Sequence, residues 1–164
     1  MASTMVVIMG EREWTNRALH LSGALAREWR AAVVLVQMAP VAHLEYLGAG
    51  VDEALLSYAD MEQLSACAAT VESYGVPVDV RLFEYSDYVG GVMCAAEQVG
   101  AAAVFAPAPT AWLPGLARLQ RWWLRHSLGA PLYTLGEGDG PLVWTPPAAL
   151  GDAPAAPQTS PILR

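Results

Sequence analysis

The sequence has no lysine, only two cysteines and two phenylalanines, and few charged side chains of any kind. Charged residues make up 15% of the 164 positions and hydrophobic residues 54%, which excludes an intrinsically disordered chain. Acidic residues exceed arginines, so the formal net charge is −7. Because binding to DNA or RNA depends on basic side chains that neutralise phosphates, this balance argues against a general nucleic-acid partner.

Residues for metal and disulfide chemistry are also scarce. Cys67 and Cys94 show neither metal-ligand spacing nor a disulfide framework. Both fall in apparent helices, where a small buried thiol is the expected role. His20, His43 and His126 are far apart in the sequence, and none has a cysteine or an acid at metal-ligand spacing. We therefore expect no bound metal and no other cofactor.

Catalytic motifs are missing as well. The sequence has no Gly-x-Ser-x-Gly turn that would present a nucleophilic serine. Glu11 and Glu13 form a carboxylate pair, but acids at the start of a helix commonly serve the helix dipole. The sequence therefore predicts a protein that is not an enzyme.

No segment has the features of an export signal or a membrane span. The start, Met-Ala-Ser-Thr-Met, has no basic residue, and the apolar run after it is short. Residues 98–117 are uncharged over about the length of a membrane span, yet their three prolines make them a poor transmembrane helix. We expect a cytoplasmic protein without direct membrane insertion.

Apolar runs that alternate with amphipathic stretches indicate an α/β protein. Helices are expected from about residue 15, at about 51–73, at 86–99 and at 114–126. Strands are expected at 5–9, 32–38, 78–82, 102–106 and 131–135. This alternation predicts a doubly wound, mainly parallel five-stranded sheet covered on both faces. The third strand alternates apolar and polar residues while the others do not, which places it at an edge.

The chain divides at about residue 136. Residues 1–136 hold every predicted element and are expected to form one domain, whereas the Gly-, Pro- and Ala-rich residues 137–164 are typical of an extended or disordered tail. The tail contains a short apolar island at Leu142–Trp144. Such an island either adds to a sheet edge or groove of a partner, or folds back on its own domain.

Three stretches carry a family resemblance: Met5–Leu19, the strand Gly100-Ala-Ala-Ala-Val-Phe, and Leu124–Leu135. Together with the order of elements between residues 5 and 135, they resemble the universal stress protein family. The resemblance implies a flavodoxin-like domain of the adenine nucleotide alpha hydrolase-like type. It also implies dimerisation through the last strand.

Some members of that family bind ATP through an aspartate after the first strand and a glycine-rich loop after the fourth, which ends in Gly-Ser or Gly-Thr. In this sequence Gly10 stands in the place of the aspartate. Ala106, Pro107 and Pro109 fall near the loop glycines, and residues 117–118 near the terminal Gly-Ser. Since proline has no N–H to offer a phosphate, the resemblance implies a member that does not bind ATP.

Two arginines are candidates for an altered ligand site. Arg12 and Arg118 follow the predicted first and fourth strands, whose carboxyl ends flank the crevice where open parallel sheets bind ligands. As a clamp they would hold a nucleotide or a small anion. The alternative is that both are solvated or pair with Glu11 and Glu13.

The fourth predicted helix favours protein contact. Trp122 and Trp123 cannot both point inward from neighbouring helical positions, so one is expected at the surface or at an interface, where tryptophan and arginine are enriched. The alternative is a tryptophan lying flat beside an arginine stem. We expect Leu116, Leu119 and Trp123 to pack on the sheet, and Arg118, Arg121, Trp122 and Arg125 to lie on the other side.

The sequence thus predicts a non-enzymatic module that acts by protein contact, as a homodimer or as an accessory subunit of a larger complex, including a membrane-protein complex. The acidic stretch 45–97 of a second copy would attract the basic helix. The alternative is a nucleotide or small-anion sensor. The expected contact residues are Arg121, Trp122, Arg125, Leu132, Tyr133 and Trp144.

Overall fold

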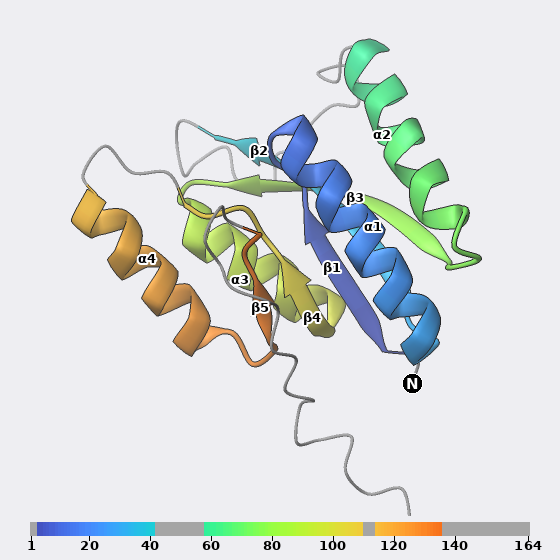
Figure 1. Ribbon diagram of the computed structural model, residues 1–164. Coiled ribbons are helices and arrows are strands. Elements are labelled where there is room, and N and C mark those ends of the chain that lie inside the picture. The colour runs from blue at the N-terminus through green and yellow to red at the C-terminus, as the bar shows by residue number, and fades with distance from the viewer. Residues whose placement is uncertain (1–2, 42–57, 110–113, 136–164) are drawn as a thin grey trace, which may run out of the picture.

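The structure, a computed structural model, describes residues 3–41, 58–109 and 114–135. Strands and helices alternate along these segments (Figure 1). In chain order they are β1 (Thr4–Ile8), α1 (Arg12–Trp29), β2 (Ala32–Pro40), α2 (Tyr58–Glu72), β3 (Val78–Tyr85), α3 (Tyr88–Val99), β4 (Ala101–Phe105), α4 (Pro114–Ser127) and β5 (Leu132–Tyr133). The predicted tail, 137–164, lies outside the described residues.

The five strands form one parallel sheet in the order β3-β2-β1-β4-β5. The predicted doubly wound α/β fold is confirmed, and so is the edge position of β3. The chain winds outward from β1 to β3 and then crosses back to β4 on the other side of β1. This reversal makes the carboxyl ends of β1 and β4 the topological switch point of the sheet.

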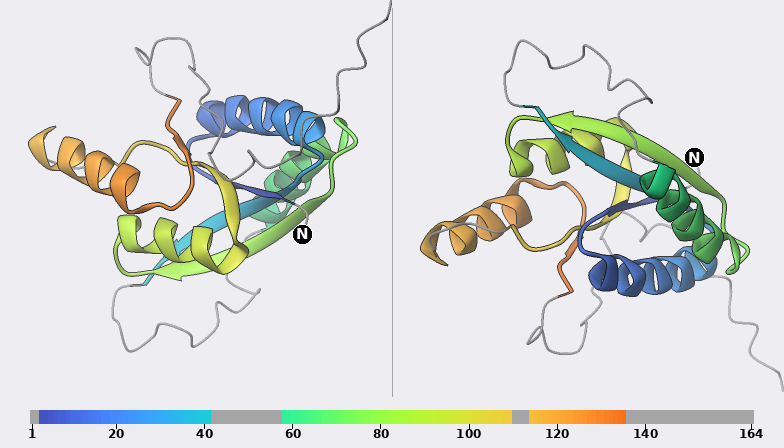
Figure 2. Two further views of the ribbon diagram at one scale, coloured as in Figure 1. Left: turned by 90° about the horizontal axis from the view of Figure 1, so that it is seen from below. Right: turned by 90° about the horizontal axis from the view of Figure 1, so that it is seen from above.

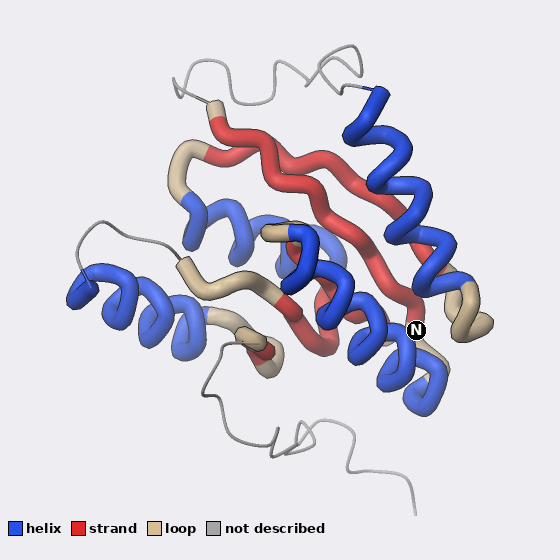
Figure 3. Tube along the Cα trace, turned by 45° about the horizontal axis from the view of Figure 1, so that its top comes forward, coloured by secondary structure: helices blue, strands red, loops and turns tan. Residues whose placement is uncertain are grey.

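Helices cover both faces of the sheet, α1 and α2 on one and α3 and α4 on the other (Figures 2 and 3). Alternate residues of each inner strand point to opposite faces. Thus Met5 and Val7 pack in the core under α1, while Val6 and Ile8 pack in the core under α3. This two-sided burial explains the continuous apolar runs in the sequence.

The ends of α3 follow the sequence prediction. Asp87 is the N-cap, and its carboxylate accepts a hydrogen bond of 2.9 Å from the N–H of Gly90. Gly100 ends the helix in the left-handed conformation, with φ of 64°. Helix α1 differs, because it begins at Arg12 rather than near Thr15. Thr15 lies buried within the first turn, so it is not a cap.

The start of α2 is turned away from the sheet. Tyr58 is 82% exposed and Met61 is 48% exposed, while Cys67 and Val71 are the buried side chains of the helix. At about 100° per residue, Tyr58 lies on the opposite side of the helix from Cys67, so both cannot face the sheet.

Candidate functional site

The switch point between β1 and β4 is where the fold would place a ligand crevice. Met9 and Ala106 follow the two strands directly, and both are buried. Gly10, Glu11 and Pro107 come next along the chain and complete the lining that the sequence predicts.

Pro107 occupies the space beside Gly10. A Cβ atom placed on Gly10 would lie 2.8 Å from Cγ of Pro107 and 3.2 Å from its Cβ. Side-chain atoms do not approach so closely, and a proline ring cannot swing aside as a flexible chain end can. The position that the resemblance gives to a nucleotide-binding aspartate therefore accepts glycine only, unless Pro107 moves.

Three main-chain donors at this end of the sheet already have partners. The N–H of Gly10 donates to Oγ1 of Thr15 at 3.0 Å, and the N–H of Met9 donates to the carbonyl of Val36 at 2.8 Å. The N–H of Ala106 donates to the carbonyl of Tyr133 at 3.1 Å. These groups hold the fold together and are not turned toward a phosphate.

Tyr88 holds the proline in place. Its hydroxyl donates a hydrogen bond of 2.9 Å to the carbonyl of Pro107. Burial raises the pKa of Tyr88 far above its usual value, with a smaller contribution from Tyr85, so the hydroxyl keeps its proton as a donor. A donor from α3 thus ties down the start of the loop after β4.

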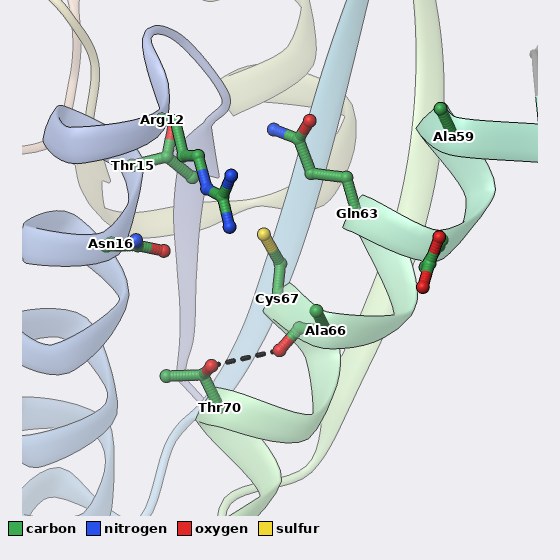
Figure 4. A pocket seen from close by; sticks show the side chains of 9 residues that line it. Arg12, Thr15, Asn16, Ala59, Gln63, Ala66, Cys67 and Thr70 are labelled. Carbon is green, nitrogen blue, oxygen red and sulfur yellow. Dashed lines mark hydrogen bonds between the residues drawn. The ribbon is translucent and has the colours of Figure 1, made fainter.

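The two candidate arginines of the anion clamp lie apart. The side chain of Arg12 points into the space between α1 and α2 (Figure 4). Arg118 is exposed on α4, which covers the opposite face of the sheet. Their placement gives no support to a joint clamp at the switch point.

Helix α4 is oriented differently from the prediction. Leu116, Leu119 and Trp123 were expected to pack on the sheet, but they are 38%, 58% and 51% exposed. The buried side chain is Leu124, which packs in the core under α3 and α4. Trp122 is 55% exposed, so both neighbouring tryptophans are at the surface.

Arg121 explains this orientation. Its guanidinium donates a hydrogen bond of 2.7 Å to Oγ1 of Thr134, a buried residue just after β5. Arg121 and Leu124 are three residues apart and lie on one side of the helix, so together they turn that side inward. Arg121 was expected at a partner contact, and the structure instead places it against its own domain.

Helix α4 lies at the edge of the domain (Figure 2), and its outward-facing side carries exposed apolar and basic side chains. We call it the α4 outer surface. It consists of Leu116, Leu119, Trp122 and Trp123 together with the exposed Arg118 and Arg125.

The last strand contributes less surface than expected. Tyr133 is only 8% exposed, and its ring stacks on Phe105 with 4.8 Å between ring centroids. Leu132 is half-buried and packs in the core under α3. The Tyr133 side chain therefore belongs to the core and is not available for a partner contact. Trp144 lies outside the described residues.

His20 and His126, the two histidines among the described residues, each make a polar contact within the domain. Nδ1 of His20 lies 2.9 Å from the hydroxyl of Tyr74, which links α1 to the end of α2. Nδ1 of His126 lies 2.8 Å from the carbonyl of Trp122 in its own helix. Within the described ranges, no group of three or more His, Cys, Asp or Glu side chains is placed to hold a metal ion. No helix in those ranges is long and apolar enough to cross a membrane.

A five-stranded parallel sheet with this strand order and a β1–β4 switch point defines a doubly wound α/β domain. The fold is that of the universal stress proteins. A universal stress family protein from Burkholderia pseudomallei gives a TM-score of 0.58 at 22% identity, over 82% of this chain and 96% of that one.

Two further universal stress proteins were solved with nucleotides. One, in complex with cAMP, gives a TM-score of 0.58 at 13% identity, over 82% of this chain and 96% of the other. The universal stress protein from Archaeoglobus fulgidus in complex with dAMP gives a TM-score of 0.56 at 15% identity, over 82% of this chain and 97% of the other. At these identities the likeness concerns the fold alone. No family model and no curated protein matches the sequence.

Proposed function

We propose that this chain is a non-enzymatic module of universal-stress type that acts by contact with a second copy of itself and does not bind ATP. The observation that carries the proposal is the α4 outer surface. Trp122 and Trp123 are each more than half exposed on one helix, beside two exposed arginines. Clusters of exposed apolar side chains with tryptophan and arginine are typical of protein contacts.

The loss of ATP binding is supported by the contact between Gly10 and Pro107. Fold relatives include proteins in complex with cAMP and dAMP, so the fold itself is compatible with a nucleotide. In this chain the proline ring stands where the switch-point crevice would open. Pro107 and Pro109 also offer no N–H to phosphate oxygens.

Two α4 outer surfaces are poorly suited to each other. Residues 101–127 contain no acidic side chain, so pairing α4 with α4 would bring Arg118 and Arg125 of both copies together. Like charges at an interface oppose association. The partner surface should therefore be acidic.

The part of the same domain that contains α2 and α3 is acidic. Residues 58–99 contain seven carboxylates and Arg81 as the only base, and Arg81 already pairs with Asp79 at 2.9 Å. On α2, the exposed Tyr58 and Met61 lie near two exposed acids. We call Tyr58, Met61, Glu62 and Glu72 the α2 outer surface. The seven carboxylates are Asp60, Glu62, Glu72, Asp79, Glu84, Asp87 and Glu97.

The two surfaces are matched in charge and in apolar content, and they lie toward opposite edges of the sheet. Contact between them is therefore head to tail: α4 of one copy against α2 of the next. Such a heterologous contact uses a different surface on each partner and does not close by itself into a dimer.

Mixing two variants tests this arrangement. Trp122→Ser/Trp123→Ser removes the apolar centre of the α4 outer surface, and Glu62→Arg/Glu72→Arg reverses the charge of the α2 outer surface. Each variant alone should be monomeric by sedimentation equilibrium, while an equimolar mixture should form a one-to-one complex. The mixture keeps one intact surface of each kind. A wild-type chain that remains monomeric at high micromolar concentration would refute the second copy as partner.

A further inference from the structure

A cleft of about 480 Å³ lies between α1 and α2. It borders the switch point, because its lining residue Thr15 accepts the hydrogen bond from the N–H of Gly10. Pockets of roughly 300–1,000 Å³ commonly hold small-molecule ligands. Its walls come from the first turn of α1 and from α2. The lining residues are Arg12, Thr15, Asn16, Ala59, Glu62, Gln63, Ala66, Cys67 and Thr70.

Several hydrogen-bonding side chains converge on this cleft without using their capacity elsewhere. Figure 4 shows the Arg12 guanidinium, the Gln63 carboxamide and the Cys67 thiol turned toward a common space, with Asn16 at its edge. Within the described part of the chain, Arg12, Asn16 and Gln63 make no hydrogen bond or ion pair to another residue. Their donors therefore remain available to a ligand.

The charges of the lining limit what can bind. Arg12 is its single cation and Glu62 its single carboxylate. A guanidinium binds one carboxylate with two parallel hydrogen bonds. A polyphosphate would need more positive charge than Arg12 supplies, and the chain as a whole carries a net charge of −7. Arg12 and Glu62 balance in charge, so the lining has room for one anionic group at the guanidinium and not for several.

Cys67 forms a neutral part of the wall. Its residue is 5% exposed, and burial raises the pKa of the thiol, with an opposing and smaller effect from the Arg12 charge. The thiol therefore stays protonated and offers a small polarisable surface rather than a second anion. Thr70 donates its hydroxyl proton to the carbonyl of Ala66 at 2.9 Å, so its oxygen faces the cleft as an acceptor.

We propose that the α1–α2 cleft binds a small organic monocarboxylate. Arg12 holds the carboxylate through its guanidinium, and the carboxamides of Asn16 and Gln63 hold polar groups on the body of the molecule. The cleft shares Glu62 with the α2 outer surface but no residue with the α4 outer surface. Arg12, the group that would hold the carboxylate, belongs to neither surface, so its substitution tests the ligand site without changing the proposed protein contact.

Nuclear magnetic resonance on the full chain tests the proposal with defined probes. Lactate, gluconate and N-acetylglutamine are titrated separately, with inorganic phosphate and ATP as comparators. At least one monocarboxylate should shift the amide signals of residues 12–16 and 63–70 at millimolar concentration, and ATP should not. Shifts confined to other regions, or a stronger effect of ATP, would overturn the proposal.

Arg12→Gln and Arg17→Gln form a matched pair on α1. Arg17 is exposed on the same helix but does not line the cleft. Because a hydrogen bond to a charged group contributes about 1.5–3 kcal/mol, Arg12→Gln should weaken monocarboxylate binding roughly tenfold or more. Arg17→Gln should bind as the wild type does. Equal affinity in the two variants would refute the role of Arg12.

The same titrations also decide whether the cleft binds any of these probes. If lactate, gluconate and N-acetylglutamine all leave the amide signals of residues 12–16 and 63–70 unchanged at millimolar concentration, the cleft is not a monocarboxylate site.

Discussion

Gly10 and Pro107 are in direct contact across the switch point of the sheet, so close that Cβ of any other residue at position 10 would stand 2.8 Å from Cγ of Pro107. The two residues come from loops that follow β1 and β4, which pair in parallel in the centre of the sheet. A proline after β4 and a glycine after β1 therefore depend on each other. The ring of Pro107 takes up the space beside Gly10 at the switch point.

Gly10→Ala should destabilise the domain by about 1–3 kcal/mol, the usual cost of forcing an extra methyl group into a packed site. The free energy of unfolding from urea denaturation measures the effect. Gly115→Ala is a suitable control, because nothing lies within 4 Å of a Cβ atom placed there and the position is helical. Similar losses of stability in both variants would contradict the close contact.

Replacing Pro107 should remove most of the penalty at position 10. Pro107→Gly takes away the ring that a new side chain would meet, so Gly10→Ala in that background should cost much less than in the wild type. The difference defines a coupling free energy of about 0.5–3 kcal/mol for residues in contact. Strictly additive effects of the two changes would show that Gly10 is required for another reason.

Substitutions at Leu124 and Leu119 show which side of α4 packs against the domain and which side is exposed. Leu124→Ala should cost about 2–5 kcal/mol of stability, because Leu124 is fully buried. Leu119 is 58% exposed, and Leu119→Ala should change stability by no more than about 0.5 kcal/mol. Thermal or chemical unfolding measures both. The reverse ranking would mean that α4 packs in the orientation predicted from the sequence.

The strand pattern could be read from the sequence because buried parallel strands are apolar on both faces. The uniform runs at Met5–Met9 and Ala32–Met38 predicted inner strands, and the alternating run at 78–83 predicted an edge strand. Pro107 and Pro109 likewise have no N–H to offer a phosphate, which can be read from the sequence alone. These inferences rest on local chemistry, which the sequence states directly.

The orientation of α4 and the α1–α2 cleft could not be read in the same way. Periodicity selects the side of α4 that carries Leu116, Leu119 and Trp123, and that side is exposed, so the pattern missed Leu124 as the buried residue. The hydrogen bond between Arg121 and Thr134 joins α4 to the end of β5, and no sequence pattern predicts it. Arg12 and Gln63 are far apart in the sequence, and only the packing of α1 beside α2 brings them to one space.

Arg121 and Arg125 should behave differently although both were expected at an interface. Arg121→Ala removes the hydrogen bond to the buried Thr134 and should cost about 1–3 kcal/mol of stability. Arg125 is exposed, so Arg125→Ala should leave stability within about 0.5 kcal/mol of the wild type. Urea denaturation at one pH compares the two. Equal stabilities would mean that Arg121 does not anchor α4 to β5.

Tyr88 makes stability sensitive to alkaline pH. Burial raises the pKa of Tyr88 above its usual value of 10.0, so the folded chain holds this proton more tightly than the unfolded chain does. The stabilisation that this difference in pKa gives to the folded chain is fully present below pH 10.0, and it is lost as the pH rises through the folded-state pKa. The free energy of unfolding should therefore fall with increasing pH in that range.

Tyr88→Phe should reduce this alkaline decline, because it removes the titrating hydroxyl. Burial also raises the pKa of Tyr133, which keeps part of the decline in the variant. At neutral pH the variant should lose about 1–2 kcal/mol, since the carbonyl of Pro107 no longer receives its hydrogen bond. Tyr58→Phe, at a residue that is 82% exposed, should match the wild type in both measurements. An unchanged alkaline slope in Tyr88→Phe would show that this hydroxyl does not hold its proton more tightly in the folded chain.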